Sequence, residues 1–181
     1  MTRPDLVADC TRCAALCCVW SAFDASDDFA FSKPAGVACR NLRRDHRCAI
    51  HDQLVGRGLR GCAAYDCHGA GPRATRLFAA TRLTDRQRHE AFLVLRDAHE
   101  LLWLLTGAAA LCPASQPELA AALARAIEAL DALAGGPAAA VLEADLAPHR
   151  AATGQLLHRL RIALGRVPVS GSPCRPGPQG A

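Results

Sequence analysis

Hydrophobic residues recur at helical spacing through the second half of the chain. Thr84 and Gln87 form a capping-box signature, which predicts the start of a helix, and the apolar run beyond it extends to about Cys112. Because this run is apolar on nearly all sides, we expect it to be the central helix of a bundle.

A second helix is predicted after this run. Ser115 and Glu118 form another capping-box signature, and apolar positions continue from there to about Ala134, just before a pair of glycines. Together with a third helix nearer the C-terminus, the pattern predicts a bundle of about three helices over residues 71–166.

The third helix is expected to begin near Pro137 and to be interrupted by Pro148. Asp145 can cap its continuation, which is predicted to reach about Gly165. Residues 167–181 are rich in Pro, Gly and Ser, and this composition predicts a disordered C-terminal tail.

Residues 1–70 differ from the rest because they hold eight of the ten cysteines. The first four follow the spacing C-x2-C-x3-C-C. At about 100° per residue they fall within an arc of about 140°, so we expect one helix with four sulfurs on one face, capped by Asp9. The eight cysteines are Cys10, Cys13, Cys17, Cys18, Cys39, Cys48, Cys62 and Cys67.

Smaller features complete this region. Phe23, Phe29 and Phe31 are expected to form a small apolar lid. A short helix is predicted to begin near Cys48 and to end by Gly58 at the latest. The predicted fold is therefore mainly α, with a cysteine-rich module over residues 1–70 that is stapled by metal and packed on the helical bundle.

Clustered thiols of this kind favour a metal, because structural zinc and four-iron clusters both take four ligands that are mostly thiolate. Eight cysteines can supply two such sites, or one site with spares. The adjacent pair Cys17 and Cys18 is awkward for a single tetrahedral ion and suits two ions better, or one ion and one core position. The nearby histidines are additional candidate ligands: His46, His51 and His68.

Two alternatives remain at this stage. Free cysteine is often a small buried hydrophobic residue, and paired cysteines form disulfides in oxidising compartments. The sequence starts without an apolar signal region, and its most apolar run, residues 101–112, is too short to span a bilayer. We therefore expect a soluble cytoplasmic protein, in which metal binding is favoured over disulfides.

The charge pattern argues against nucleic acid as a partner. The net charge is +4, but residues 40–60 are basic while residues 117–147 are acidic. A nucleic-acid-binding protein usually presents one basic face, and this chain has no such single-sign stripe.

No arrangement typical of an enzyme is recognisable. The histidine–glutamate pairs lack the H-E-x-x-H spacing of zinc proteases, and the G-x-G-x-x-G match over residues 56–61 follows no predicted strand. His99 shares a helical face with Phe92 and is expected to be a core histidine rather than a ligand. Cys112 and Cys174 are expected to lie outside the metal site.

The cysteine pattern resembles the CxxCxxCC-type zinc- or iron-chelating (YkgJ-like) family. The resemblance rests on C-x2-C-x3-C-C, Cys39-x2-Leu42, Cys48-x-Ile50 and the final pair Cys62 and Cys67. The interval between Cys13 and Cys17 is one residue longer than in the family's name. The resemblance implies a chelating role for these eight cysteines but leaves the metal unnamed.

A second resemblance covers roughly residues 6–165. Segments such as LCCVWSAFDASDDFAFSKPAG and LRDAHELLWLLT are similar to the N-terminal part of actinobacterial pentapeptide repeat-containing proteins. The repeats themselves are missing from this chain, so no function tied to them is implied.

These observations predict a metal-binding cytosolic protein that holds zinc or an iron–sulfur cluster, with a structural metal that supports an interaction role. The alternative is an iron–sulfur redox protein or enzyme component. The helical bundle is a candidate surface for forming a homo- or hetero-oligomer.

Overall fold

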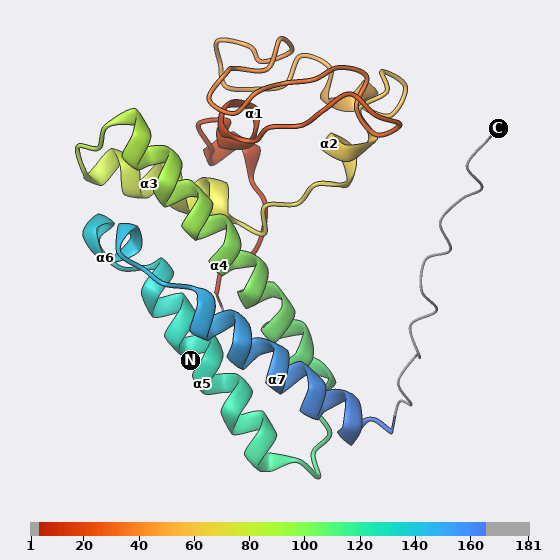
Figure 1. Cartoon of the computed structure of the whole chain (residues 1–181), viewed down its shortest axis with the longest axis vertical. Helices are drawn as coiled ribbons and strands as arrows, with labels where there is room; N and C mark the ends of the chain where they lie inside the picture. Colours follow the sequence, from red (N-terminus) through yellow and green to blue (C-terminus); the bar gives the residue numbers. More distant parts are fainter. Residues whose placement is uncertain (1–3, 166–181) are drawn as a thin grey trace, which may run out of the picture.

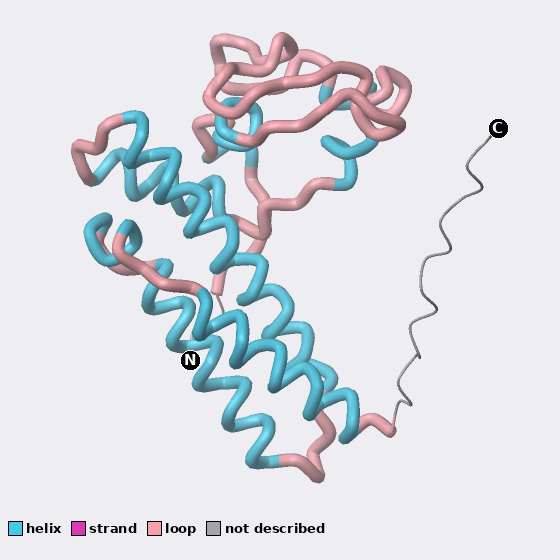
Figure 2. The backbone as a smooth tube through the Cα atoms, in the orientation of Figure 1, coloured by secondary structure: helices cyan, strands magenta, loops and turns pink. Residues whose placement is uncertain are grey.

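The computed structural model describes residues 4–165, and within that range its regular elements are all helical apart from isolated β-bridges. Figure 1 shows long helices forming one body, with the loops of the cysteine-rich module gathered at one end of it. Figure 2 makes the contrast clear, since that module is mostly loop while the rest is mostly helix. The elements are the 3₁₀ helices η1 (Cys10–Arg12) and η2 (His51–Gln53) and the α-helices α1 (Leu16–Trp20), α2 (Arg60–Ala64), α3 (Ala70–Ala80), α4 (Asp85–Leu111), α5 (Pro117–Ala134), α6 (Ala138–Leu142) and α7 (Ala147–Ala163).

Helix α4 is the central element, as the sequence predicted. Its capping box is formed in both directions: the Thr84 hydroxyl accepts from the Gln87 amide nitrogen at 3.3 Å, and the Gln87 side chain accepts from the Thr84 amide nitrogen at 3.0 Å. The helix runs for 27 residues to Leu111 and contacts α3, α5, α6 and α7. This length is about 40 Å at 1.5 Å per residue.

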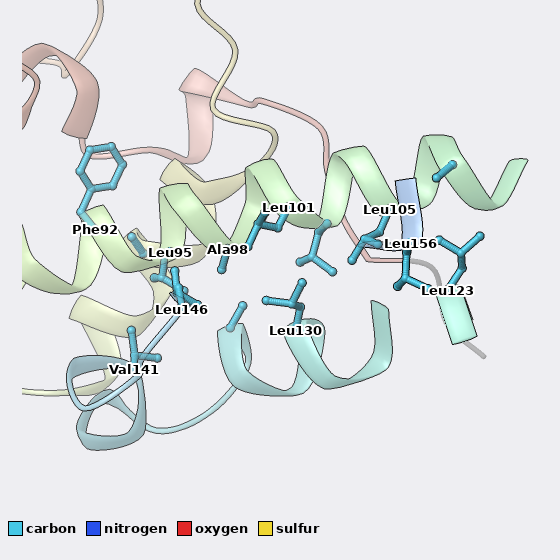
Figure 3. Close-up of a cluster of buried hydrophobic side chains, with 14 of the residues drawn as sticks. Phe92, Leu95, Ala98, Leu101, Leu105, Leu123, Leu130, Val141, Leu146 and Leu156 are labelled. Atoms are coloured by element: carbon cyan, nitrogen blue, oxygen red, sulfur yellow. The ribbon is translucent and has the colours of Figure 1, made fainter. Parts of the chain in front are cut away.

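The hydrophobic core lies between α4 and the helices that cover it (Figure 3). Phe92 at the start of this row is fully buried, and burial of a side chain of this size contributes about 1.5–3 kcal/mol. Other core residues shown in the figure are Leu95, Ala98, Leu101 and Leu105 of α4, Leu123 and Leu130 of α5, Val141 of α6, Leu146, and Leu156 of α7. No helix in residues 4–165 is long and apolar enough to cross a membrane.

Two expected details of the bundle are wrong. The predicted capping box at Ser115 does not form, because α5 begins at Pro117 and Gln116 precedes it without a side-chain cap. Pro148 does not interrupt a helix but lies in the first turn of α7, where the missing N–H of proline removes no helical hydrogen bond. Asp145 does assist the start of α7, because its carboxylate accepts from the Ala147 amide at 2.9 Å.

The single helix predicted across the first four cysteines is also wrong. The chain forms η1, then an extended residue at Cys13, and only then α1. Ala15 separates the two helices with a φ of +57°, a left-handed conformation that costs an L-residue roughly 1–2 kcal/mol. Asp9 caps η1 as expected, accepting from the Thr11 amide at 2.8 Å.

The three phenylalanines of the predicted lid do contact one another. The rings of Phe23 and Phe29 stack with centroids 4.4 Å apart, and Phe31 meets Phe23 edge-on at 5.5 Å. The predicted short helix after Cys48 is only the 3₁₀ turn η2. The tail predicted to be disordered, residues 167–181, lies outside the described residues.

Arg73 of α3 ties that helix to the end of α5. Its guanidinium pairs with the Asp131 carboxylate at 2.7 Å and also donates to the backbone oxygens of Asp131 and Ala134, at 3.1 and 3.0 Å. Both carbonyls belong to the last turn of α5; the Asp131 carbonyl also accepts from the Gly135 amide at 2.9 Å, whereas helix ends leave carbonyls such as that of Ala134 without a helical partner. Arg73 therefore acts as a side-chain cap that joins two helices.

We expect Arg73→Met to lower the free energy of unfolding by about 2 kcal/mol, because it breaks a partly buried charged hydrogen-bond network. Urea denaturation of the purified chain measures the change. Arg76→Met is the matched control, since Arg76 is an exposed arginine on the same helix and should change stability by less than about 0.5 kcal/mol. Equal losses in the two variants would contradict the proposed cap.

Candidate metal centre

Four of the predicted ligands line one small cavity where the module meets α3 and α4. Its volume is about 20 Å³, close to the room that one water molecule needs. We call these four the first cysteine group: Cys10, Cys13, Cys17 and Cys67. The remaining wall is made by Asp9, Gly71, Pro72 and Phe92, so the central helix of the bundle also borders the cavity.

Backbone contacts hold this group against the first turns of α3. The Ala14 amide, next to Cys13, donates to the Thr75 hydroxyl at 3.0 Å, and that hydroxyl donates to the Gly71 carbonyl at 2.9 Å. Cys67 lies three residues before the first residue of α3, and its carbonyl accepts from the Ala70 amide at 2.9 Å. Two segments more than 50 residues apart therefore meet at the start of one helix.

Gly71 leaves the space that these sulfurs occupy. A Cβ atom at this position would lie 2.7 Å from the Cys13 sulfur and 3.6 Å from the Cys67 sulfur. The first distance is shorter than atoms tolerate, so any larger residue would push the sulfurs away. The cavity is thus shaped for sulfur atoms to approach the helix backbone closely.

We expect Gly71→Ala to destabilise the protein by about 1–3 kcal/mol through overpacking, although alanine favours helices. Gly107→Ala is the matched control, because a Cβ at the exposed Gly107 of α4 meets nothing within 4 Å. This control should stabilise the chain by up to about 1 kcal/mol. Thermal unfolding compares the two variants, and stabilisation by both would show that the space at Gly71 has no packing role.

The other four cysteines form a second neighbourhood, which we call the second cysteine group: Cys18, Cys39, Cys48 and Cys62. The Cys39 amide donates to the Cys18 carbonyl at 2.9 Å. An isolated antiparallel bridge pairs Leu42 with Cys48, which brings Cys48 back to the turn that follows Cys39. Cys62 lies on α2, and the pKa of its thiol is raised by burial and then by the charges of the other three.

Lys33 is buried beside this second group, and the sequence analysis missed its role. Its side chain is 4% exposed, and its ammonium donates to the carbonyls of Val19, Pro34 and Val37 at 3.1, 3.1 and 2.8 Å. Burial lowers the pKa of Lys33, and the negative charges of Cys39 and Cys18 oppose that shift. The signal in the sequence was that this is the one lysine among 21 basic residues.

Cys17 and Cys18 belong to different groups although they are adjacent on α1. Cys17 lines the cavity of the first group, whereas Cys18 does not. The neighbouring Cys18 thiol and burial raise the pKa of Cys17 strongly. The neighbouring Cys17 thiol in turn lowers the pKa of Cys18 to about 7, together with the charges of Lys33 and His51.

The three candidate histidines have different surroundings, and His68 directly follows Cys67 of the first group. His46 is exposed in a turn with a φ of +62°, and His51 is exposed beside Asp52. His68 stacks on the ring of Trp103 with centroids 4.7 Å apart. None of them borders the cavity of the first group.

Two further sequence expectations concern His99 and Cys112. His99 is fully buried in α4, and its Nδ1 bonds to the His68 carbonyl while its Nε2 has no partner, which agrees with a core histidine. Cys112 follows the last residue of α4 and contacts the carbonyls of Pro113 and Gln116. Cys174 lies outside the described residues.

All nine cysteines in residues 4–165 are free thiols, so the disulfide alternative is not seen in that range. As the side chains stand, no three Cys, His, Asp or Glu residues of this range converge closely enough to hold one ion. A cysteine sulfur moves by about 3 Å when χ1 changes rotamer. The backbone therefore makes the cysteines neighbours, and changes of side-chain rotamer would be needed to bring their sulfurs around one ion.

The chain is similar to the uncharacterized protein YybG of Bacillus subtilis (strain 168). The two are 40% identical over 107 residues, which is 56% of this chain and 38% of YybG. This chain therefore spans about two fifths of the length of that relative. No family model matches the chain, and no solved structure matches it.

Proposed function

We propose that the protein binds zinc or an iron–sulfur cluster through its N-terminal cysteines, and that the metal holds the cysteine-rich module together and against the bundle. The observation that carries this proposal is the gathering of cysteines from distant segments around the cavity at Gly71. Thiolates are the ligands that both zinc and iron–sulfur clusters prefer.

The module's lack of a core of its own supports a structural role for the metal. In the described part of the chain before Gly69, four apolar residues are buried: Ala15, Leu16, Leu54 and Leu59. Its strand pairing consists of isolated bridges. Regions this small and this poor in apolar burial usually need a metal or disulfides to stay folded.

The residues fit such a group chemically. The first cysteine group would supply thiolates beside the N-terminus of α3, whose partial positive charge stabilises anions. The second group would supply thiolates beside the Lys33 ammonium. When bound, the metal would supply fixed thiolate cross-links between segments that are otherwise joined by few contacts.

Elemental analysis and an absorption spectrum of the anaerobically purified full chain test this function. A colourless protein with stoichiometric zinc, or a brown protein with iron and sulfide, supports it, and the second result also favours the redox alternative. A variant with all eight cysteines changed to serine should hold neither, whereas Cys112→Ser should match the parent. A parent protein with no bound metal after growth in zinc- and iron-supplemented medium would overturn the proposal.

The remaining parts of the proposal concern location and partners. Free thiols and metal thiolates favour a reducing compartment, so we place the protein in the cytoplasm. The helical bundle is the proposed surface for an oligomer or a partner, since Trp103, Leu111 and Ile162 are exposed there at 51, 64 and 63%. We propose that the CxxCxxCC-type proteins and the pentapeptide repeat-containing proteins are relatives of this chain. Mass measurement in solution tests for an oligomer.

A further inference from the structure

We propose that the eight cysteines make two separate tetrathiolate sites, with α1 giving one ligand to each. The first site is Cys10, Cys13, Cys17 and Cys67, and the second is Cys18, Cys39, Cys48 and Cys62. This inference rests on the proposed metal-binding function and specifies its ligands.

The break in the chain at Ala15 excludes the simplest grouping. Had residues 10–18 formed one helix, the first four cysteines would share a face and make one site by themselves. In the structure Cys10 lies in η1 and Cys13 is extended, while Cys17 and Cys18 lie in α1. Cys10, Cys13 and Cys17 still line one cavity, but the fourth cysteine there is Cys67 rather than Cys18.

Helix geometry separates Cys17 from Cys18. Neighbouring residues on a helix point about 100° apart, so the side chains of Cys17 and Cys18 leave α1 in different directions. Cys17 borders the cavity together with Cys67, a residue from the far end of the module. Cys18 instead pairs through its backbone with Cys39. The adjacent residues Cys17 and Cys18 thus belong to two different sites.

Each group has four cysteines and one source of positive charge. Four thiolates with one divalent ion, or with one four-iron cluster of charge 2+, carry a net charge of about −2. At the first site the start of α3 faces this charge, since Cys13 and Cys67 lie against Gly71. At the second site the ammonium of Lys33 is buried among the carbonyls of Val19, Pro34 and Val37. The two environments are distinct, as separate sites require.

Zinc stoichiometry of the full chain tests the partition. The parent should bind two zinc ions, whereas Cys67→Ser and Cys62→Ser should each bind one, and the double variant none. Cys112→Ser should still bind two. A parent that binds one zinc, lost in either single variant, would overturn the partition but keep the proposed function. A parent that binds neither zinc nor an iron–sulfur cluster would overturn both.

A second measurement needs no substitution and so covers variants that fail to fold. The metal-free chain is loaded with one equivalent of zinc and alkylated briefly with iodoacetamide, and the protected cysteines are mapped by mass spectrometry. The four cysteines of each proposed site should be protected from alkylation to the same extent. The protection of Cys17 should follow that of the first site, and the protection of Cys18 that of the second. Joint protection of Cys17 and Cys18 with Cys10 and Cys13, as one site, would overturn the partition.

Discussion

Removing the metal from the full chain is expected to unfold residues 4–69 and to leave the long helices intact. The module has few buried apolar residues, so metal–thiolate bonds must supply most of its stability. Structural zinc contributes about 10–16 kcal/mol of apparent binding free energy at neutral pH, more than such a small region gains from packing. The core between α4 and α5 is built from apolar side chains of the long helices, with Cys13 only packed against the cluster, and it should persist.

Limited trypsin digestion with circular dichroism measures this outcome. After treatment with a strong chelator, cleavage should become rapid at the exposed arginines of the module, which include Arg43, Arg44, Arg47 and Arg57. The helical signal of the bundle should fall only slightly. Returning zinc should restore protection in the parent but not in the variant with eight serines. If cleavage in the module is unchanged without metal, the metal does not hold the module folded.

The bundle could be predicted from the sequence because its signals are local. The capping box at Thr84 and Gln87 and the apolar run beyond it correctly indicated α4 and its central position. The missed cap at Ser115 shows the limit of such signals, since Pro117 is an equally good first residue of a helix and took that place.

The path of the chain through the first cysteines could not be predicted from periodicity. Alanine has the highest helix propensity, yet Ala15 adopts a left-handed conformation. The preceding Ala14 amide is bonded to the Thr75 hydroxyl, 61 residues away, and this long-range contact directs the chain away from a continuous helix. Such a contact leaves no trace in the spacing of the cysteines.

The eight candidate cysteines were identified from composition and spacing, but their neighbours were not. Gly71 and Lys33 each touch or face sulfur atoms, and neither lies in the cysteine motifs. A glycine in a helix and a lysine in an isolated bridge have many ordinary explanations. Only the approach of Gly71 to the Cys13 sulfur and the burial of Lys33 connect them with the candidate centre.

Lys33→Met is expected to weaken zinc binding at the second site by about 10–100-fold, the usual effect of losing a partner that supports metal ligands. Methionine keeps much of the side-chain volume but removes the positive charge beside Cys18 and Cys39. It also removes the donor that joins the carbonyls of Val19, Pro34 and Val37, which should destabilise the loop that holds Cys39. The first site, which faces α3 instead, should keep its zinc.

Competition with a chromogenic zinc chelator measures this effect as two phases of zinc release. In Lys33→Met one phase should become faster, while the other should match the parent. Arg44→Met is the matched control, since it removes one positive charge from an exposed position of the same module and should alter neither phase by more than about two-fold. If the lysine and arginine variants release zinc alike, the ammonium of Lys33 is only a structural anchor for its three carbonyls. A faster single phase that carries both ions would instead mean that the thiolates of the two groups share one centre.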